Sequence, residues 1–251
     1  MTEFVKEADK PILLLLHALG VEGKCWEPVA ALLDNFTVLS PDFPGHGTAA
    51  LTDEPMTVRM LADSLTQKLR DAGITRTHVA GMSLGGLVAQ ELAARHPDLV
   101  DRLVLIDTVA TYPEIVRQQW RDRAVIARES GMQSLIAPTI DAWFTRDAID
   151  ADTPAVRAVK EMISAINPEA YARACELLEH ADTRESLTAI TAPTLIVCGS
   201  DDLPAFLAAV PMFEESISGA QVAWIDPGRH AAALESPNAF VAALRKFLLA
   251  K

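Results

Sequence analysis

Hydrophobic residues along the first part of the chain form short continuous runs separated by segments of helical spacing. The runs are Ile12–Leu16, Phe36–Ser40, His78–Ala80 and Arg102–Asp107. Continuous apolar runs of this length are typical of strands buried on both faces of a parallel sheet. Their alternation with helical segments predicts an α/β fold, with a mostly parallel sheet and helices on both faces.

The segments between these runs have the pattern of amphipathic helices. They are Trp26–Leu33, Thr57–Ala72 and Leu87–Arg95. In the second of them the large apolar residues recur every three or four positions, and Gly73 follows at a position typical of a helix end. Each helix is therefore expected to pack one face against the sheet.

The alternation stops after Asp107. From about Tyr112 to about Leu187 the pattern is helical only, and strand patterns resume at Pro193–Cys198 and Gln221–Ile225. A closing helix, Ala239–Leu249, follows Ser236-Pro237, with proline in the first turn. We therefore expect a core built from residues 1–110 and 188–251, interrupted by a helical cap at 111–187 that lies over the strand ends.

Composition limits the possible partners. The chain has 251 residues, of which 50% are hydrophobic, enough for one large core with an inserted cap. With 22 Lys and Arg against 34 Asp and Glu, its net charge is -12. This charge argues against nucleic acid or an anionic membrane surface as a partner, because both require a basic face. An anionic small molecule requires only a local positive group and stays possible.

The cysteines and the N-terminal residues indicate the compartment. Cys25, Cys175 and Cys198 are few, odd in number and without metal-ligand spacing, which is typical of reduced cytosolic thiols. The first residues lack the basic region of a signal peptide, and the run Ile12–Leu16 is too short to span a bilayer. We expect a cytoplasmic protein with no bound metal. The oligomeric state stays open.

The segment around Ser83 carries the strongest chemical signal. An apolar strand pattern ends in Gly81-Met82-Ser83-Leu84-Gly85, and a helical pattern follows directly. A serine at such a sharp strand-to-helix turn exposes its hydroxyl at a helix N-terminus, where free N–H groups favour developing negative charge. The small neighbours allow two backbones to pass closely. We predict that Ser83 is a nucleophile.

A serine nucleophile requires a base, and His230 is the best candidate. It lies in a turn after the last predicted strand, at the same sheet edge as Ser83. The loop residues His17 and His46 are more simply explained as shaping their loops. The remaining histidines begin a strand, end a helix or lie in the insertion: His78, His96 and His180.

The base requires a carboxylate to orient it, and two aspartates follow the preceding strand. We favour Asp202, with Asp201 as the alternative. The chain order Ser83, Asp202, His230 is the order in which α/β-hydrolases carry their triad. The oxyanion of a tetrahedral intermediate would be held by two backbone N–H groups, those of Leu84 and Leu19.

These motifs together resemble the α/β-hydrolase family over nearly the whole chain. The matching stretches are His17–Gly20, Pro41–Gly47, Gly81–Gly86, Pro193–Asp202 and Gly228–His230 with Leu234–Pro237. Within the family the chain looks most like 3-oxoadipate enol-lactonases, through Ala142–Thr145 and Met162–Cys175, running on to Asp182–Leu187. This resemblance implies hydrolysis of an enol-lactone to an oxo-dicarboxylic acid in aromatic catabolism, without a cofactor. Family members usually begin with a β-hairpin, but here at most one extra strand fits before Pro11.

The cap is expected to supply the substrate pocket. Trp143 is the main candidate for lining it, with Phe144 and Tyr171 as further candidates. A substrate with a free carboxylate would require one cation from the cap, and the sequence leaves six: Arg123, Arg128, Arg146, Arg157, Lys160 and Arg173. The open alternatives to an enol-lactonase are a general carboxylesterase or other lactonase, a C–C bond hydrolase of ring-fission products, and a non-catalytic ligand sensor.

Overall fold

The computed structural model describes residues 10–250, and in this part the chain forms one six-stranded parallel sheet. The strand order is β2-β1-β3-β4-β5-β6. The strands are β1 (Ile12–Leu16), β2 (Thr37–Leu39), β3 (Thr77–Met82), β4 (Val100–Ile106), β5 (Thr194–Gly199) and β6 (Gln221–Ile225). The expected parallel α/β sheet is confirmed.

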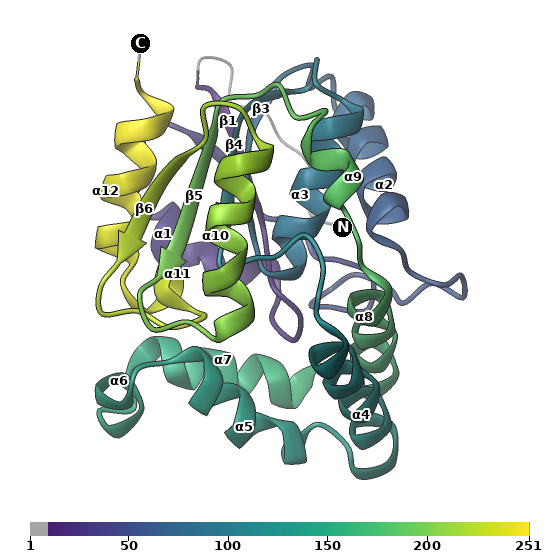
Figure 1. Cartoon of the computed structure of the whole chain (residues 1–251). Helices are drawn as coiled ribbons and strands as arrows, with labels where there is room; N and C mark the ends of the chain where they lie inside the picture. The colour runs from purple at the N-terminus through teal and green to yellow at the C-terminus, as the bar shows by residue number, and fades with distance from the viewer. Residues whose placement is uncertain (1–9, 251) are drawn as a thin grey trace.

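Helices cover both faces of the sheet. On one side α1 (Glu27–Ala30) packs with α12 (Pro237–Leu248), and the rings of Trp26 and Phe240 lie 6.0 Å apart. On the other side α2 (Val58–Asp71) packs with α3 (Leu84–Arg95), and α10 (Pro204–Ser216) packs on β5 and β6 (Figure 1). Two short segments, η1 (Gly23–Trp26) and α11 (Ala232–Glu235), lie in connections. This layering explains why β1 and β3 are buried along their whole length.

The segment between β4 and β5 is helical. It comprises α4 (Glu114–Ser130), α5 (Gln133–Trp143), α6 (Arg146–Asp150), α7 (Pro154–Ala165), α8 (Pro168–His180) and α9 (Arg184–Leu187). The first five form a layer beneath the edge to which the arrows of β5 and β6 point, whereas α9 packs beside α3 (Figure 1). Strand ends and cap helices thus face each other across one edge of the sheet.

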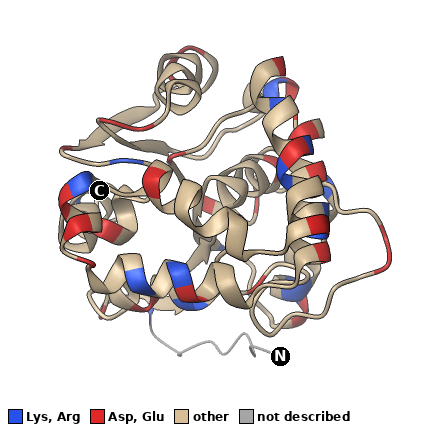
Figure 2. Ribbon diagram, turned by 90° about the horizontal axis from the view of Figure 1, so that it is seen from below, with Lys and Arg blue, Asp and Glu red and all other residues tan. Residues whose placement is uncertain are grey.

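Charged residues are frequent along two packed helices of the cap, α4 and α8. Figure 2 shows acidic and basic residues side by side along the helices at right, where α4 and α8 pack together. There the Arg128 guanidinium bonds both Glu169 and Glu176. In the described part of the chain, no helix is both long and apolar enough to cross a membrane.

Element boundaries differ from the sequence pattern at a few places. The helix expected over Trp26–Leu33 is reduced to η1 and the four-residue α1. Helix α3 begins at Leu84, directly after Ser83, rather than at Leu87, because small glycines hide the helical pattern of its first turn. Helix α10 has no counterpart in the expected elements. The possible strand before Pro11 would fall on residues 1–9, outside the described part.

Candidate active site

Ser83 occupies a strained turn between β3 and α3. Its φ of 53° and ψ of -113° are rare for a residue with a side chain. The turn depends on missing side chains, because a Cβ on Gly81 would approach the Gly85 carbonyl oxygen to 2.2 Å. Thr108, in the connection after β4, holds the turn through its hydroxyl, which donates to the Ser83 carbonyl oxygen at 2.7 Å. The backbone therefore holds the Ser83 side chain in one place.

His230 and Asp202 are hydrogen-bonded to each other. The distance from His230 Nδ1 to Asp202 Oδ2 is 3.1 Å, and both side chains are buried. The other Asp202 oxygen, Oδ1, accepts the Leu203 N–H at 2.6 Å. Asp201, in contrast, is exposed and bonds to the Ser200 hydroxyl. The geometry thus supports Asp202 over Asp201 as the carboxylate partner of His230.

Aromatic side chains enclose the His230 ring. The Phe206 ring lies 4.1 Å from it, and the Trp143 ring lies 5.6 Å away in an edge-on arrangement. The Ala231 N–H, next to His230, donates to the Trp143 carbonyl at 2.9 Å. The cap and the last loop of the core therefore position this ring together.

A cavity of about 530 Å³ brings Ser83 and His230 to one space between sheet and cap. Leu19 lines the same cavity. Among the described residues no hydrogen bond joins Ser83 Oγ to His230, and such bonds are often loose before substrate binds. The other lining residues used below are Ile115, Trp120, Arg123, Thr139, Trp143, Tyr171, Leu203 and Phe206.

The backbone around the two expected oxyanion donors is close-packed. Leu84 is the first residue of α3, and the N–H groups of a helix's first turn have no acceptor within the helix. A Cβ on the next residue, Gly85, would lie 2.4 Å from the Leu16 carbonyl oxygen, so the end of β1 abuts the start of α3. The Leu19 loop, which follows β1, thus lies beside the helix N-terminus.

His17 and His46 brace the loop that carries Leu19. The Phe43 N–H donates to His17 Nε2 at 3.0 Å, and the Gly20 N–H donates to His46 Nε2 at 3.3 Å. Burial lowers the pKa of His17 to about 4 and that of His46 to about 3. Both rings are neutral acceptors at neutral pH, which agrees with the loop-shaping role expected for them.

Arg123 is the cation that the cap directs into this cavity. Its half-buried guanidinium donates to the Tyr171 hydroxyl at 2.5 Å and to Thr139 Oγ1 at 2.6 Å. Within residues 10–250 it has no carboxylate partner. The other five cations considered from the sequence all pair with carboxylates: Arg128, Arg146, Arg157, Lys160 and Arg173.

The cap residues expected in the pocket separate into two groups. Trp143 and Tyr171 line the cavity, whereas Phe144 does not and is fully buried in the hydrophobic core. Sequence reasoning missed Phe206 and Trp120. The signal for Phe206 was the apolar segment directly after Asp202, because residues that follow a strand end can reach the site.

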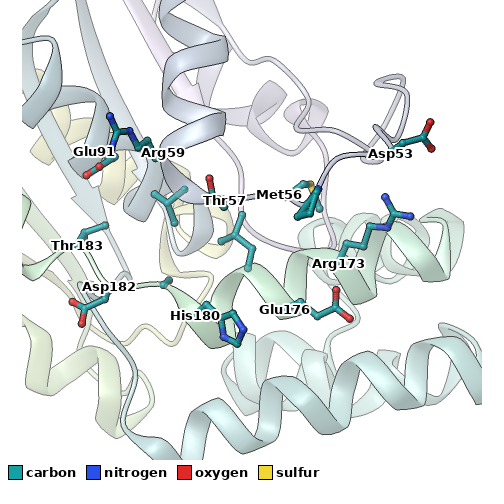
Figure 3. Close-up of a pocket in the computed structure, with 14 residues that line it drawn as sticks. Asp53, Met56, Thr57, Arg59, Glu91, Arg173, Glu176, His180, Asp182 and Thr183 are labelled. Carbon is teal, nitrogen blue, oxygen red and sulfur yellow. The ribbon is translucent and has the colours of Figure 1, made fainter.

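A second cavity of about 670 Å³ lies away from Ser83 and His230. Figure 3 shows Arg173, Glu176 and His180 on α8 facing the segment that leads into α2, with Met56 and Thr57. Its described lining contains no serine or cysteine, and the one histidine there, His180, is exposed. The smaller cavity, which Ser83 and His230 line, is therefore the candidate active site.

Comparison with known protein families identifies one family that matches most of the chain. Residues 13–244 match the model of the alpha/beta hydrolase family. The chain is 28% identical to 3-oxoadipate enol-lactonase 2 of Acinetobacter baylyi over 235 residues, covering 93% of this chain and 87% of that protein. It is 32% identical to a pimeloyl-[acyl-carrier protein] methyl ester esterase of Chromobacterium violaceum, covering 95% and 94%.

Solved structures agree with this result. The crystal structure of the enol-lactonase from Burkholderia xenovorans LB400 superposes with a TM-score of 0.92 at 30% identity, covering 98% of this chain and 94% of that one. The similar proteins therefore include both a lactone hydrolase and a methyl ester hydrolase.

Proposed function

Because the chain belongs to the alpha/beta hydrolase family, we propose that it is a serine hydrolase that opens an enol-lactone bearing a free carboxylate, such as 3-oxoadipate enol-lactone. The observation that carries this proposal is the shared cavity of Ser83, His230 and Arg123. A candidate nucleophile, its candidate base and a guanidinium with no carboxylate partner among the described residues line one space of suitable size for a small lactone.

The proposed reaction begins at Ser83. His230 takes the hydroxyl proton as Oγ attacks the lactone carbonyl, while Asp202 orients the ring and stabilises the imidazolium. The N–H groups of Leu84 and Leu19 hold the oxyanion. The enolate then leaves and takes a proton, and water activated by His230 releases the acid from Ser83. No cofactor enters this scheme.

Arg123 would select the anionic substrate. A half-buried guanidinium is most stable beside a carboxylate, and its present partners are the neutral hydroxyls of Tyr171 and Thr139. A substrate carboxylate would supply the missing negative charge at a fixed distance from the nucleophile. Among the described residues that line the cavity, Arg123 is the only Lys, Arg, Asp or Glu, so this one contact would decide the selectivity for an anionic substrate.

The test compares two substrates in two matched variants. Arg123→Met should reduce kcat/KM for the carboxylate-bearing enol-lactone by about 10- to 100-fold, the range for losing a charge-assisted hydrogen bond. For the corresponding carboxamide lactone, which is neutral and of equal size, kcat/KM should change by less than about 3-fold in the same variant. Arg128→Met is the control, because Arg128 is also on α4 but pairs with surface carboxylates.

Two results would contradict the proposal. Equal losses on both substrates in Arg123→Met would remove its role in charge selection. Turnover of the lactone by a folded Ser83→Ala variant would remove the serine mechanism.

General carboxylester hydrolysis is the second candidate. The identity of 32% to a methyl ester esterase supports it. So does the apolar rim of the cavity, where Ile115 is 71% exposed and Leu203 is 37% exposed. Higher kcat/KM for p-nitrophenyl or methyl esters than for any lactone would favour this candidate.

A further inference from the structure

Asp107 is a buried carboxyl group that the mechanism above does not use. It directly follows β4, and 1% of its surface is exposed. One of its oxygens, Oδ1, accepts the Gly199 N–H at 2.8 Å. Its other oxygen, Oδ2, is buried and has no hydrogen-bond partner among residues 10–250. A buried oxygen that accepts no hydrogen bond destabilises the folded state, so the environment of this oxygen requires an explanation.

The nearest polar groups include the Asp202 carboxylate. One oxygen of Asp107, the Cys198 sulfur and one oxygen of Asp202 lie within 4.8 Å of one another, and all three residues are buried. Two negative carboxylates at this separation in a water-poor environment repel each other strongly. A proton between them removes the repulsion and gives Oδ2 its partner. Asp202 is already committed as an acceptor to His230 and Leu203.

We propose that the Asp107 carboxyl group stays protonated and donates a hydrogen bond to the Asp202 carboxylate, as a positioning residue that aims Asp202 at His230. The catalytic part of this inference rests on the proposed function. The proton remains on Asp107 throughout the reaction and is not transferred.

The charges around Asp107 agree with this arrangement. The titratable groups that face it are Cys198 from β5 and Asp202 from the loop after β5. Burial, and then the charge of Asp202, raise the pKa of the Asp107 carboxyl well above its ordinary value. Burial also raises the pKa of the Cys198 thiol. Because metals bind the thiolate, a neutral thiol makes this cluster a poor metal site and favours a proton as the positive partner.

The backbone alone does not explain Asp107. Its φ of 43° lies in the left-handed region, which asparagine adopts as readily as aspartate. Asparagine would also accept from Gly199 and donate an N–H toward Asp202. Asp107→Asn is therefore the conservative substitution that keeps the proposed contacts, and Asp107→Ala removes them.

The kinetic test follows kcat/KM against pH for the wild-type protein and the two variants. We expect Asp107→Ala to lower kcat/KM by about 10- to 100-fold, the range for residues that orient a reacting group through a hydrogen bond without touching the substrate. We expect Asp107→Asn to recover most of that loss and to keep the acid limb of the profile within about 0.3 pH units. A shift of that limb to lower pH by a full unit in Asp107→Asn would mean that a negative charge was removed, and would overturn the proposal.

A stability measurement tests the proton without any substrate. A carboxyl that stays protonated in the folded protein but ionises in the unfolded chain lowers stability increasingly as pH rises above about 4. The gain in Tm of Asp107→Asn over wild type should therefore be near zero at pH 4 and grow up to pH 8. A Tm difference between Asp107→Asn and wild type that stays constant from pH 4 to pH 8 would overturn the proposal. This readout is independent of turnover, so a failure of the lactonase assignment leaves it interpretable.

Discussion

Gly86 shows how single residues set the position of the candidate nucleophile. It lies three residues after Ser83, in the first turn of α3, against the side chain of Thr108. The Thr108 hydroxyl in turn bonds the Ser83 carbonyl. The strained backbone of Ser83 is thus held through a contact that only glycine permits.

Replacing Gly86 by alanine should therefore disturb both stability and chemistry. The new Cβ would lie 2.5 Å from Thr108 Cβ and Oγ1, so Thr108 must shift and weaken its bond to Ser83. We expect a loss of about 1–3 kcal/mol in the free energy of unfolding, as for other overpacked sites, together with a lower kcat. Denaturant unfolding and kinetics on one ester measure both.

Gly73→Ala provides the control for this prediction. Gly73 has a φ of 69° at the end of α2, where a Cβ would meet nothing within 4 Å. The substitution should cost about 1–2 kcal/mol through backbone strain while kcat stays close to wild type. Equal kcat in Gly86→Ala and wild type would contradict the role given to the Thr108 contact.

At the scale of elements, α4 and α8 form the outer part of the cap and share an ion-pair network. The Glu169 carboxylate on α8 bonds Arg128 on α4 and Arg173 one turn along α8. These hydrogen bonds, Arg128 first, lower the pKa of Glu169 to about 2. The side chain is 42% exposed, so water and salt weaken the network.

Glu169→Gln should reveal this network through its pH dependence. The folded protein holds the Glu169 carboxyl ionised, so its contribution is present above the ordinary pKa of 4.5 and is lost as pH falls toward about 2. Wild type should exceed Glu169→Gln by no more than about 1 kcal/mol at pH 7, and the difference should vanish near pH 2. Chemical unfolding at several pH values measures it.

Glu161→Gln is the matched control. Glu161 is exposed on α7 and has no ion-pair partner among the described residues. Its substitution should change stability by less than about 0.5 kcal/mol at every pH. A Glu169→Gln difference that grows on acidification would contradict the assigned direction of the pKa shift.

The elements were largely predictable because their patterns are local. The buried strands β1, β4 and β5 have continuous apolar runs, and the cap follows from a long segment without such runs. Helix α10 was not predicted because it is apolar nearly all round and its sequence carries two prolines, at its start and inside it. The start of α3 was hidden by the glycines that the turn at Ser83 requires.

The candidate site is a property of the whole molecule. Ser83, Asp202 and His230 lie on three connections that meet at one edge of the sheet, and motif and chain order suffice to predict that meeting. The choice of Arg123 among six cations was not predictable, because it depends on which carboxylates lie nearby after folding. The proximity of Asp107 and Asp202 was not predictable either, because the two residues follow neighbouring strands, β4 and β5, and are 95 positions apart in the sequence.

In the proposed mechanism the fold activates the Ser83 hydroxyl through His230. Mass spectrometry after reaction with a fluorophosphonate probe, followed by peptide mapping, tests it most directly. We predict one adduct, on the peptide containing Ser83, absent in Ser83→Ala and formed at least about 100-fold more slowly in His230→Ala. An adduct on another residue, or undiminished labelling of a folded His230→Ala variant, would contradict the account.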